Sequence, residues 1–459
     1  MAAHITARTG DSLISRFLTD YGMVLALLLL CTVFSVITIT EQHPTGRAGG
    51  ERLAAQVFGE LGQGSRVLVV ARDNREEGEF ADILVTRLGK SRVTVTAVVK
   101  GQPPDARAAL AEAARGGKKL DAVVCTQTVS TWAVIERAGE NFPELAGVRV
   151  LKPQSYVWPN FLKADNLLNV ANQIAVIAII AIGMTLVIIT AGIDLSVGSL
   201  IALSAVVAAL LMRDLAGARE ATVLGMTLSC LGGIAVCGLV GGFTGAMVTV
   251  FDIPPFIVTL GMMLVASGLA YHIAEGQSIY QIPDSFVWLG VGADFLNIPN
   301  AVCLMLVLYA VAHVLMTRMV LGRYIYAVGG NREAARLSGV PVRRVLLFVY
   351  TLCGCLAGLG GVIMASQLKS GSPTYGQMYE LYVIAAVVVG GTSLAGGEGK
   401  ILGTLIGAFI IAVIQNGMNL TGVESYTQKV VLGLVILGAV LLDMLKKRGF
   451  LRLPGLPRA

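Results

Sequence analysis

Charged and aromatic residues are both scarce in this 459-residue chain. Asp, Glu, Lys and Arg make up 14% of it, whereas soluble domains carry about 25%. Aromatic residues make up 6%, and no stretch interleaves them with basic residues, so the net charge of +6 does not indicate a nucleic-acid partner. Hydrophobic residues account for 55%, and the mean hydropathy is +0.74. This composition predicts a polytopic protein embedded in the lipid bilayer.

Patterns that carry catalysis or metal binding are also missing from the sequence. The four histidines, His4, His43, His272 and His313, are scattered without metal-ligand spacing and without a paired cysteine or carboxylate set. No Walker-type loop is present, so an ATP-driven process would need a separate ATPase subunit. We therefore expect no enzyme activity, no catalytic residue, no metal and no cofactor.

Ten apolar segments predict ten membrane crossings. The first, over 21–40, follows Arg8 and Arg16 and ends without a small-residue cleavage site, so it predicts an uncleaved span with a cytoplasmic N-terminus. The others lie at about 166–190, 196–212, 222–250, 255–274, 298–318, 345–366, 380–395, 401–417 and 427–444. Segment 380–395 is interrupted by glycines and could equally be broken or re-entrant. An even number of crossings returns the C-terminus to the cytoplasm, in a multi-pass protein of the plasma (inner) membrane.

The stretch over 41–160 differs sharply from the rest, because it is charged and alternates strand and helix patterns. It predicts strands over 66–71 and 93–100 and helices over 76–88 and 105–115, which together indicate a small α/β domain with a mostly parallel sheet. The span count makes this domain extracytoplasmic. Cys125 is the one cysteine here, so the domain cannot hold an internal disulfide.

The predicted fold is therefore an all-α polytopic membrane protein with a small α/β domain inserted after the first span. Its predicted parts are a cytoplasmic N-terminus and first span over 1–40, the inserted domain over 41–160, a helical core over 161–445 and a cytoplasmic basic tail over 446–459.

One polar island, 323–344, interrupts the apolar second half with the sequence RYIYAVGGNREAARLSGVPVRR. Arginines in and around it predict a cytoplasmic loop; they are Arg318, Arg323, Arg332, Arg336, Arg343 and Arg344. Asn331 can cap a short helix over 332–338, and Gly339 with Pro341 can end it. A helix this short is marginal alone, which favours a docking helix for a cytosolic partner over a loop with a solvated arginine face.

This island resembles the coupling-helix loop in permease subunits of ATP-binding-cassette importers, in the ribose and monosaccharide group. Two further stretches match the same group, IITAGIDLSVGS over 188–199 and ELYVIAAVVVGGTSLAGGEGKILG over 380–403. The resemblance covers about 161–443 and leaves 41–160 outside. The chain departs from the family pattern at Ala191, where Gly is usual, and at Tyr382, where an acidic residue is common.

One set of functional residues is implied by the resemblance, and a second consists of the few polar residues in or beside the apolar segments. The ATPase-coupling set is Gly330, Asn331, Arg332, Glu333, Ala334, Ala335, Arg336, Ser338 and Gly339. The candidate translocation-path set is Thr190, Asp194, Ser196, Glu380, Thr392, Ser393 and Asn416. An aspartate beside hydrocarbon suggests a function, although Asp194 or Ser196 could instead cap the helix that begins near 197.

The sequence thus predicts the membrane subunit of a monosaccharide importer. Its expected partners are a cytoplasmic ATP-binding subunit, an extracytoplasmic sugar-binding protein and a second permease copy, identical or not. A secondary transporter or channel for a small polar solute is the alternative, but ion coupling normally needs more buried ionisable residues. A membrane-anchored receptor that uses 41–160 would not need ten spans. The inserted domain resembles one lobe of a sugar-binding protein, yet one lobe cannot close around a ligand, which favours a structural or docking role.

Overall fold

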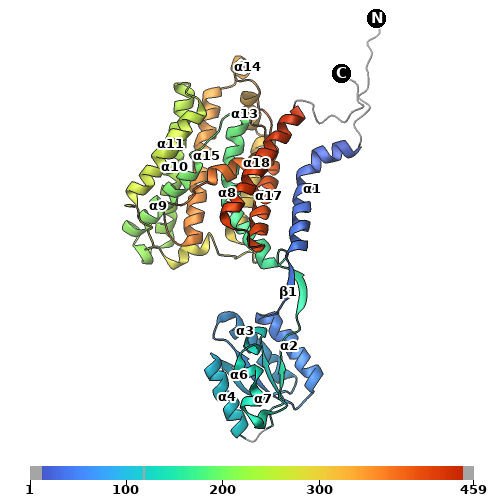
Figure 1. Cartoon of the computed structure of the whole chain (residues 1–459). Coiled ribbons are helices and arrows are strands. Elements are labelled where there is room, and N and C mark those ends of the chain that lie inside the picture. The colour runs from blue at the N-terminus through green and yellow to red at the C-terminus, as the bar shows by residue number, and fades with distance from the viewer. Residues whose placement is uncertain (1–12, 117–118, 448–459) are drawn as a thin grey trace. The chain divides into compact units, whose positions relative to one another are not determined.

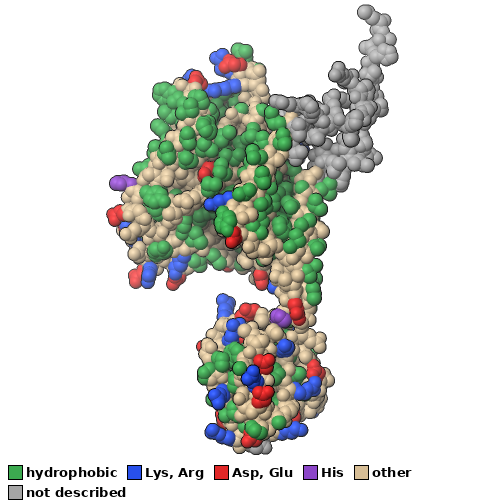
Figure 2. All heavy atoms as spheres, in the orientation of Figure 1, with side chains coloured by type: hydrophobic (Ala, Val, Ile, Leu, Met, Phe, Trp, Pro, Cys, Tyr) green, Lys and Arg blue, Asp and Glu red, His purple; other side chains and the backbone are tan. Residues whose placement is uncertain are grey.

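Two compact units make up the chain in a computed structural model that describes residues 13–116 and 119–447 (Figure 1). The helical unit contains the residues up to Thr38 and from Asn160 onward, and the α/β unit is Ile39–Pro159. The predicted basic tail over 446–459 lies outside the described residues from position 448, and so does Arg8. Hydrophobic side chains cover much of the visible flank of the helical unit, whereas charged side chains are spread over the α/β unit (Figure 2).

The helical unit consists of twelve α-helices within the described residues. They are α1 Leu13–Ile37, α8 Ala164–Ile189, α9 Val197–Asp214, α10 Val223–Val250, α11 Pro255–Ile273, α12 Asn300–Arg318, α13 Val320–Gly330, α14 Arg332–Leu337, α15 Val342–Leu368, α16 Tyr379–Val389, α17 Ile401–Leu420 and α18 Ser425–Lys447. Short 3₁₀ turns at Ala218–Glu220 and Asp284–Trp288 lie in the connections.

Seven of these helices are long and apolar enough to cross a membrane: α8, α9, α10, α11, α12, α15 and α17. Shorter apolar stretches lie at Gly22–Ile37, Tyr379–Val389 and Ser425–Leu441. The prediction of a polytopic helical membrane protein is confirmed at this level.

Two predicted spans differ from the helices observed. The segment over 380–395 contains a helix that ends at Val389, because Gly390 and Gly391 follow and Gly391 has a φ of 80°. The first span was expected to reach residue 40, but α1 ends at Ile37 because Ile39–Gln42 pairs as a strand.

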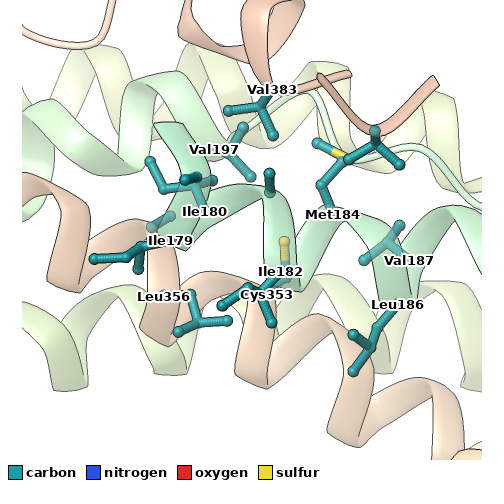
Figure 3. Packing of buried hydrophobic residues seen from close by; sticks show 14 of the residues in the cluster. Ile179, Ile180, Ile182, Met184, Leu186, Val187, Val197, Cys353, Leu356 and Val383 are labelled. Carbon is teal, nitrogen blue, oxygen red and sulfur yellow. The ribbon is translucent and has the colours of Figure 1, made fainter. Parts of the chain in front are cut away.

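Helix α8 forms the centre of the helical unit. Every residue from Ile174 to Ile189 is buried, and α8 packs against α12, α15, α16 and α17. Figure 3 shows Ile179, Ile182 and Leu186 of α8 among side chains of α15, including Cys353 and Leu356. A helix that is apolar on all sides is suited to the middle of such a bundle.

Helices α10 and α15 lie in close contact because glycines line both surfaces. A Cβ added at Gly241 of α10 would overlap the Tyr350 carbonyl oxygen, and one at Gly354 of α15 would overlap the Cys237 carbonyl oxygen. Small residues at a membrane-helix interface allow this backbone approach, so packing rather than chemistry explains the glycines of α10.

The α/β unit contains two sheets and the helices around them. Its elements are β1 Ile39–Gln42, α2 Gly46–Leu61, β2 Arg66–Ala71, α3 Arg75–Lys90, β3 Thr94–Lys100, α4 Pro103–Arg115, β4 Ala122–Cys125, α5 Gln127–Ser130, α6 Ala133–Glu136, α7 Ala138–Asn141, a 3₁₀ turn at Pro143–Leu145, β5 Arg149–Leu151 and β6 Tyr156–Pro159. Four parallel strands form the main sheet in the order β3-β2-β4-β5, and β1 pairs with β6 antiparallel.

Helices cover both faces of the four-stranded sheet, which explains why β2 is apolar at successive positions. Val67 and Val69 pack into one core with Phe80 and Leu84 of α3. Leu68 and Val70 pack into a second core that includes Leu110 of α4 and Ile135 of α6. The unit therefore has three layers, with the sheet in the middle.

Candidate functional site

The helix α14 begins and ends where the cap and stop signals predict. The Asn331 side chain accepts a hydrogen bond from the Ala334 amide at 2.9 Å, and Gly339 follows the helix with a φ of 84°. Ala335 is buried against the helical unit, whereas Leu337 is 82% exposed. A two-turn helix docked on one side and carrying an exposed leucine on another has the form of a binding surface.

The charged side chains of α14 form ion pairs within the chain. Arg336 pairs with Glu333 on the same helix at 2.9 Å, and Arg332 pairs with Asp252, in the turn between α10 and α11, at 3.1 Å. All four side chains are substantially exposed, so these pairs contribute little to stability. They remain available to exchange partners when another protein binds.

Three segments far apart in sequence meet just before α14, at what we call the glycine junction: Ile189–Ala191, Tyr326–Gly330 and 396–399. The Gly397 amide donates to the Ile189 carbonyl at 2.8 Å. The Tyr326 hydroxyl donates to the Gly399 carbonyl at 2.7 Å. A Cβ added at Gly329 would overlap the Ile189 oxygen and lie 2.7 Å from the Gly397 amide nitrogen.

The glycine junction gives α14 a short mechanical connection to the membrane helices. Gly329 lies in the last turn of α13, Ile189 ends the central helix α8, and Gly397 lies between α16 and α17. Because backbone touches backbone here, no flexible side chain absorbs a displacement. The ends of α13 and α8 and the α16–α17 connection are therefore in direct backbone contact just before α14.

Ala191 lies at this junction in a conformation that favours glycine, since its φ is 61°. A left-handed conformation costs a non-glycine residue about 1–2 kcal/mol. The departure from the family pattern at this position is thus a source of local strain.

Ala191→Gly should raise the midpoint of thermal unfolding of the purified permease, because it relieves this strain. The matched control is Ala181→Gly in the middle of α8, which should lower the midpoint, since glycine in a helix interior costs about 0.5–1 kcal/mol. Equal decreases for both variants would contradict the strain argument. The measurement is differential scanning fluorimetry in detergent.

Three predicted path residues lie in the α8–α9 connection. The Thr190 hydroxyl donates to the Val187 carbonyl at 2.8 Å. The buried Asp194 accepts the Ser196 amide at 2.9 Å and the Ser196 hydroxyl at 2.6 Å through Oδ1. Its Oδ2 has no hydrogen-bond partner among the described residues. Asp194 therefore binds Ser196, the residue just before α9, through one of its two carboxylate oxygens. Neither side chain bonds the first amides of α9 in the described part of the chain, so the capping expected from the sequence is not observed.

The other candidate path residues lie at three different locations in the helical unit. Glu380 lies against the first turn of α9, where a Cβ at Gly198 would overlap its Oε2. Thr392 and Ser393 lie in the α16–α17 connection, and Thr392 would be 2.8 Å from a Cβ added at Gly399. Asn416 exchanges amide hydrogen bonds of 2.9 and 3.0 Å with Asn166.

The predicted path residues are therefore not one cluster. Thr190 and Thr392 lie beside the glycine junction, Asp194 and Glu380 flank the start of α9, and Asn416 joins α17 to α8. Sequence reasoning missed Gly329, Tyr326 and Leu337. The double glycine before Asn331 was the available signal for the first of these, because adjacent glycines at a helix end permit close backbone approach.

The α/β unit has its own candidate crevice, at the carboxyl ends of β2 and β4, where strand order reverses and ligands bind in open α/β sheets. The buried Glu77 side chain occupies this place. It accepts the Arg72 amide at 2.8 Å, the Arg72 Nε–H at 2.6 Å and the Thr126 hydroxyl at 3.2 Å. The carboxylate satisfies the donors that a ligand would need.

The chain is similar to a known protein family and to several known permease proteins. The family "Branched-chain amino acid transport system / permease component" matches residues 166–440. The ribose import permease protein RbsC of Escherichia coli K12 is 43% identical over 332 residues, covering 70% of this chain and 99% of that protein. RbsC of Bacillus subtilis 168 is 44% identical, with 63% and 87% covered, and the D-allose transport system permease protein AlsC of E. coli K12 is 39% identical, with 62% and 85% covered. No solved structure matches the chain.

Proposed function

The chain belongs to the family of branched-chain amino acid transport system permease components, and we propose that it moves ribose or a related monosaccharide into the cell as the membrane subunit of an ATP-driven importer. The observation that carries the mechanism is the glycine junction. All three stretches of the resemblance meet there, and they connect α14 to α8 and to the α16–α17 connection.

In this proposal α14 is the coupling helix. A cytoplasmic ATPase subunit docks on it through Leu337 and the exposed charges of Glu333 and Arg336. ATP-driven closure displaces α14, and the glycine junction passes the displacement to the helices around the path. Alternating access then follows from a movement of packed helices rather than from ion binding.

The proposed topology has ten crossings with both termini in the cytoplasm. It adds α1, α16 and α18 to the seven long helices. Helix α16 has 11 residues and is about 16 Å long, so it crosses together with the following glycine segment, as a broken helix whose backbone is covered by protein. The arginines around α13 and α14 support a cytoplasmic position for the coupling helix.

The partners in this proposal are the ATPase subunit, an extracytoplasmic sugar-binding protein and a second permease copy. The two permease copies together form the path. The α/β unit, as an inserted extracytoplasmic domain, has a structural or docking role. Occupation of its crevice by Glu77 supports this role over that of a sugar-binding lobe.

Reconstitution tests the proposal directly. The permease, the co-purified ATPase and the binding protein are placed in proteoliposomes, and uptake of a panel of pentoses and hexoses is measured with and without ATP. We expect ATP-dependent uptake of ribose or a close relative and none without the ATPase. Uptake driven by an ion gradient in the absence of the ATPase would instead indicate a secondary transporter.

A cysteine placed at Gln102 should react with a membrane-impermeant maleimide in intact spheroplasts, because Gln102 is exposed on the α/β unit. The native Cys125 does not interfere, since burial raises the pKa of its thiol to about 12 and leaves little thiolate. Labelling that needs permeabilisation would contradict the proposed topology.

A further inference from the structure

A cavity of about 260 Å³ opens between α8, α15, α16 and α17, away from the glycine junction. Its volume lies slightly below the ~300–1,000 Å³ of pockets for drug-sized ligands, so it suits a small solute. Gln173 of α8 lies 16 residues before Ile189, which places the two about 24 Å apart along the helix. The cavity is therefore near the end of the bundle opposite α14.

Three amide side chains from three helices line this cavity: Gln173, Gln367 and Gln415. Gln367 donates from Nε2 to the Asn172 carbonyl at 3.1 Å, which fixes its orientation. The side chains of Gln173 and Gln415 make no hydrogen bond with any described residue. Each thus offers both an amide donor and a carbonyl acceptor to a ligand.

The remaining lining is aromatic and aliphatic. Tyr379, at the start of α16, is largely buried and is held by an edge contact with Tyr382, with ring centroids 6.1 Å apart. Ile174 and Met364 supply apolar wall. Tyr382, the position at which the sequence departs from the family pattern, therefore helps to position an aromatic ring at this cavity.

The chemistry of the lining selects a class of ligand. No Asp, Glu, Lys, Arg or His lines the cavity, so it offers no partner for an ion or for the two charges of an amino acid. Amide groups that can donate and accept suit hydroxyl groups, and the aromatic and aliphatic walls suit the C–H face of a sugar ring. An acyl chain would leave the amides unpaired.

We propose that this cavity is the site where the permease receives the monosaccharide, with Gln173 and Gln415 bonding its hydroxyl groups and Tyr379 contacting its ring. The assignment rests on the proposed function and adds the residues of the receiving site to it. None of the path residues inferred from sequence lines the cavity.

Protection from thiol labelling tests the site on the full-length permease. Ribose at high millimolar concentration should still occupy the cavity of Gln415→Cys and slow its labelling about tenfold. Adding Gln173→Ala should remove most of that protection, because the double variant lacks both amide side chains assigned to the hydroxyl groups. Mass spectrometry of the labelled peptide gives the rate, and sorbitol at the same concentration controls for solvent effects.

Gln277→Cys is the matched control, since Gln277 lines a different cavity, beside Arg213 and Glu275. Ribose should leave its labelling rate unchanged. Equal slowing of Gln415→Cys and Gln277→Cys, or no slowing of either, would overturn the site assignment.

Sugar uptake by the reconstituted transporter distinguishes an error in the site assignment from an error in the proposed function. In reconstituted transporter, the double variant Gln173→Ala, Gln415→Ala should take up ribose about tenfold more slowly than the double variant Gln277→Ala, Gln281→Ala. If the unmodified transporter carries sugar and the first variant matches it, the site assignment fails alone. If the unmodified transporter carries no sugar with ATP, the proposed function fails.

Discussion

Permease carrying Leu337→Asp is expected to insert and fold normally but to lose its ATPase subunit. Leu337 is 82% exposed at the end of α14, so aspartate there disturbs no internal contact. Burying a leucine side chain at an interface contributes about 1.5–3 kcal/mol, which corresponds to roughly 10–100-fold in the dissociation constant. Placing a carboxylate in the same interface adds a desolvation cost.

The measurement is co-purification of the ATPase with tagged permease, followed by titration of the purified subunits. Leu215→Asp is the matched control, because Leu215 is 79% exposed but follows the C-terminal end of α9. The other end of α9, its N-terminus, is the one near the glycine junction and α14. ATPase recovery should be normal for Leu215→Asp. Equal recovery with both variants would reject α14 as the docking helix.

Gly329→Ala is expected to cause the largest loss of transport among small substitutions. The added Cβ would overlap the Ile189 carbonyl oxygen, which belongs to backbone and cannot rotate away. Forcing extra volume into a packed site typically costs about 1–3 kcal/mol. We expect α13 and α8 to separate, which breaks the connection between α14 and the path.

Gly268→Ala provides the matched control, since Gly268 lies in α11, outside the glycine junction, and a Cβ there has no atom within 4 Å. Sugar uptake by reconstituted transporter should fall about 5–150-fold for Gly329→Ala, the equivalent of about 1–3 kcal/mol at this contact. It should change little for Gly268→Ala. A thermal melt separates a coupling defect from general unfolding. Normal uptake by Gly329→Ala would show that the junction does not transmit movement.

Signals that act over a few residues of the sequence were sufficient to predict individual helices and strands. The cap at Asn331 and the stop at Gly339 predicted α14 because both act within one or two turns. The apolar run over 66–71 coincides with β2, since strands buried on both faces are apolar at successive positions. The glycines at 390 and 391 are a local signal of the same kind, and α16 ends at Val389 directly before them.

Contacts between distant segments could not be predicted in this way. Ile189, Gly329 and Gly397 belong to three separate matching stretches, and their order in the sequence contains no information that they touch. Asn416 is polar in an apolar segment, which fits either a path residue or a hydrogen bond between helices, and its amide pairs with Asn166 of α8. The sequence also could not show that the amides of Gln173 and Gln415 line one cavity, because only the packing of four helices creates it.

The way the chain leaves and rejoins the helical unit makes the α/β unit removable. The Asn160 amide donates to the Thr38 carbonyl at 2.9 Å, and the Phe161 amide donates to the Thr38 hydroxyl at 3.1 Å, so the two cut ends would lie side by side. A two-residue turn is enough to join antiparallel neighbours of this kind. A single insertion or deletion at this point could therefore add, remove or exchange the α/β unit without changing the sequence of any helix in the helical unit. The same point can be used to insert a different domain by protein engineering.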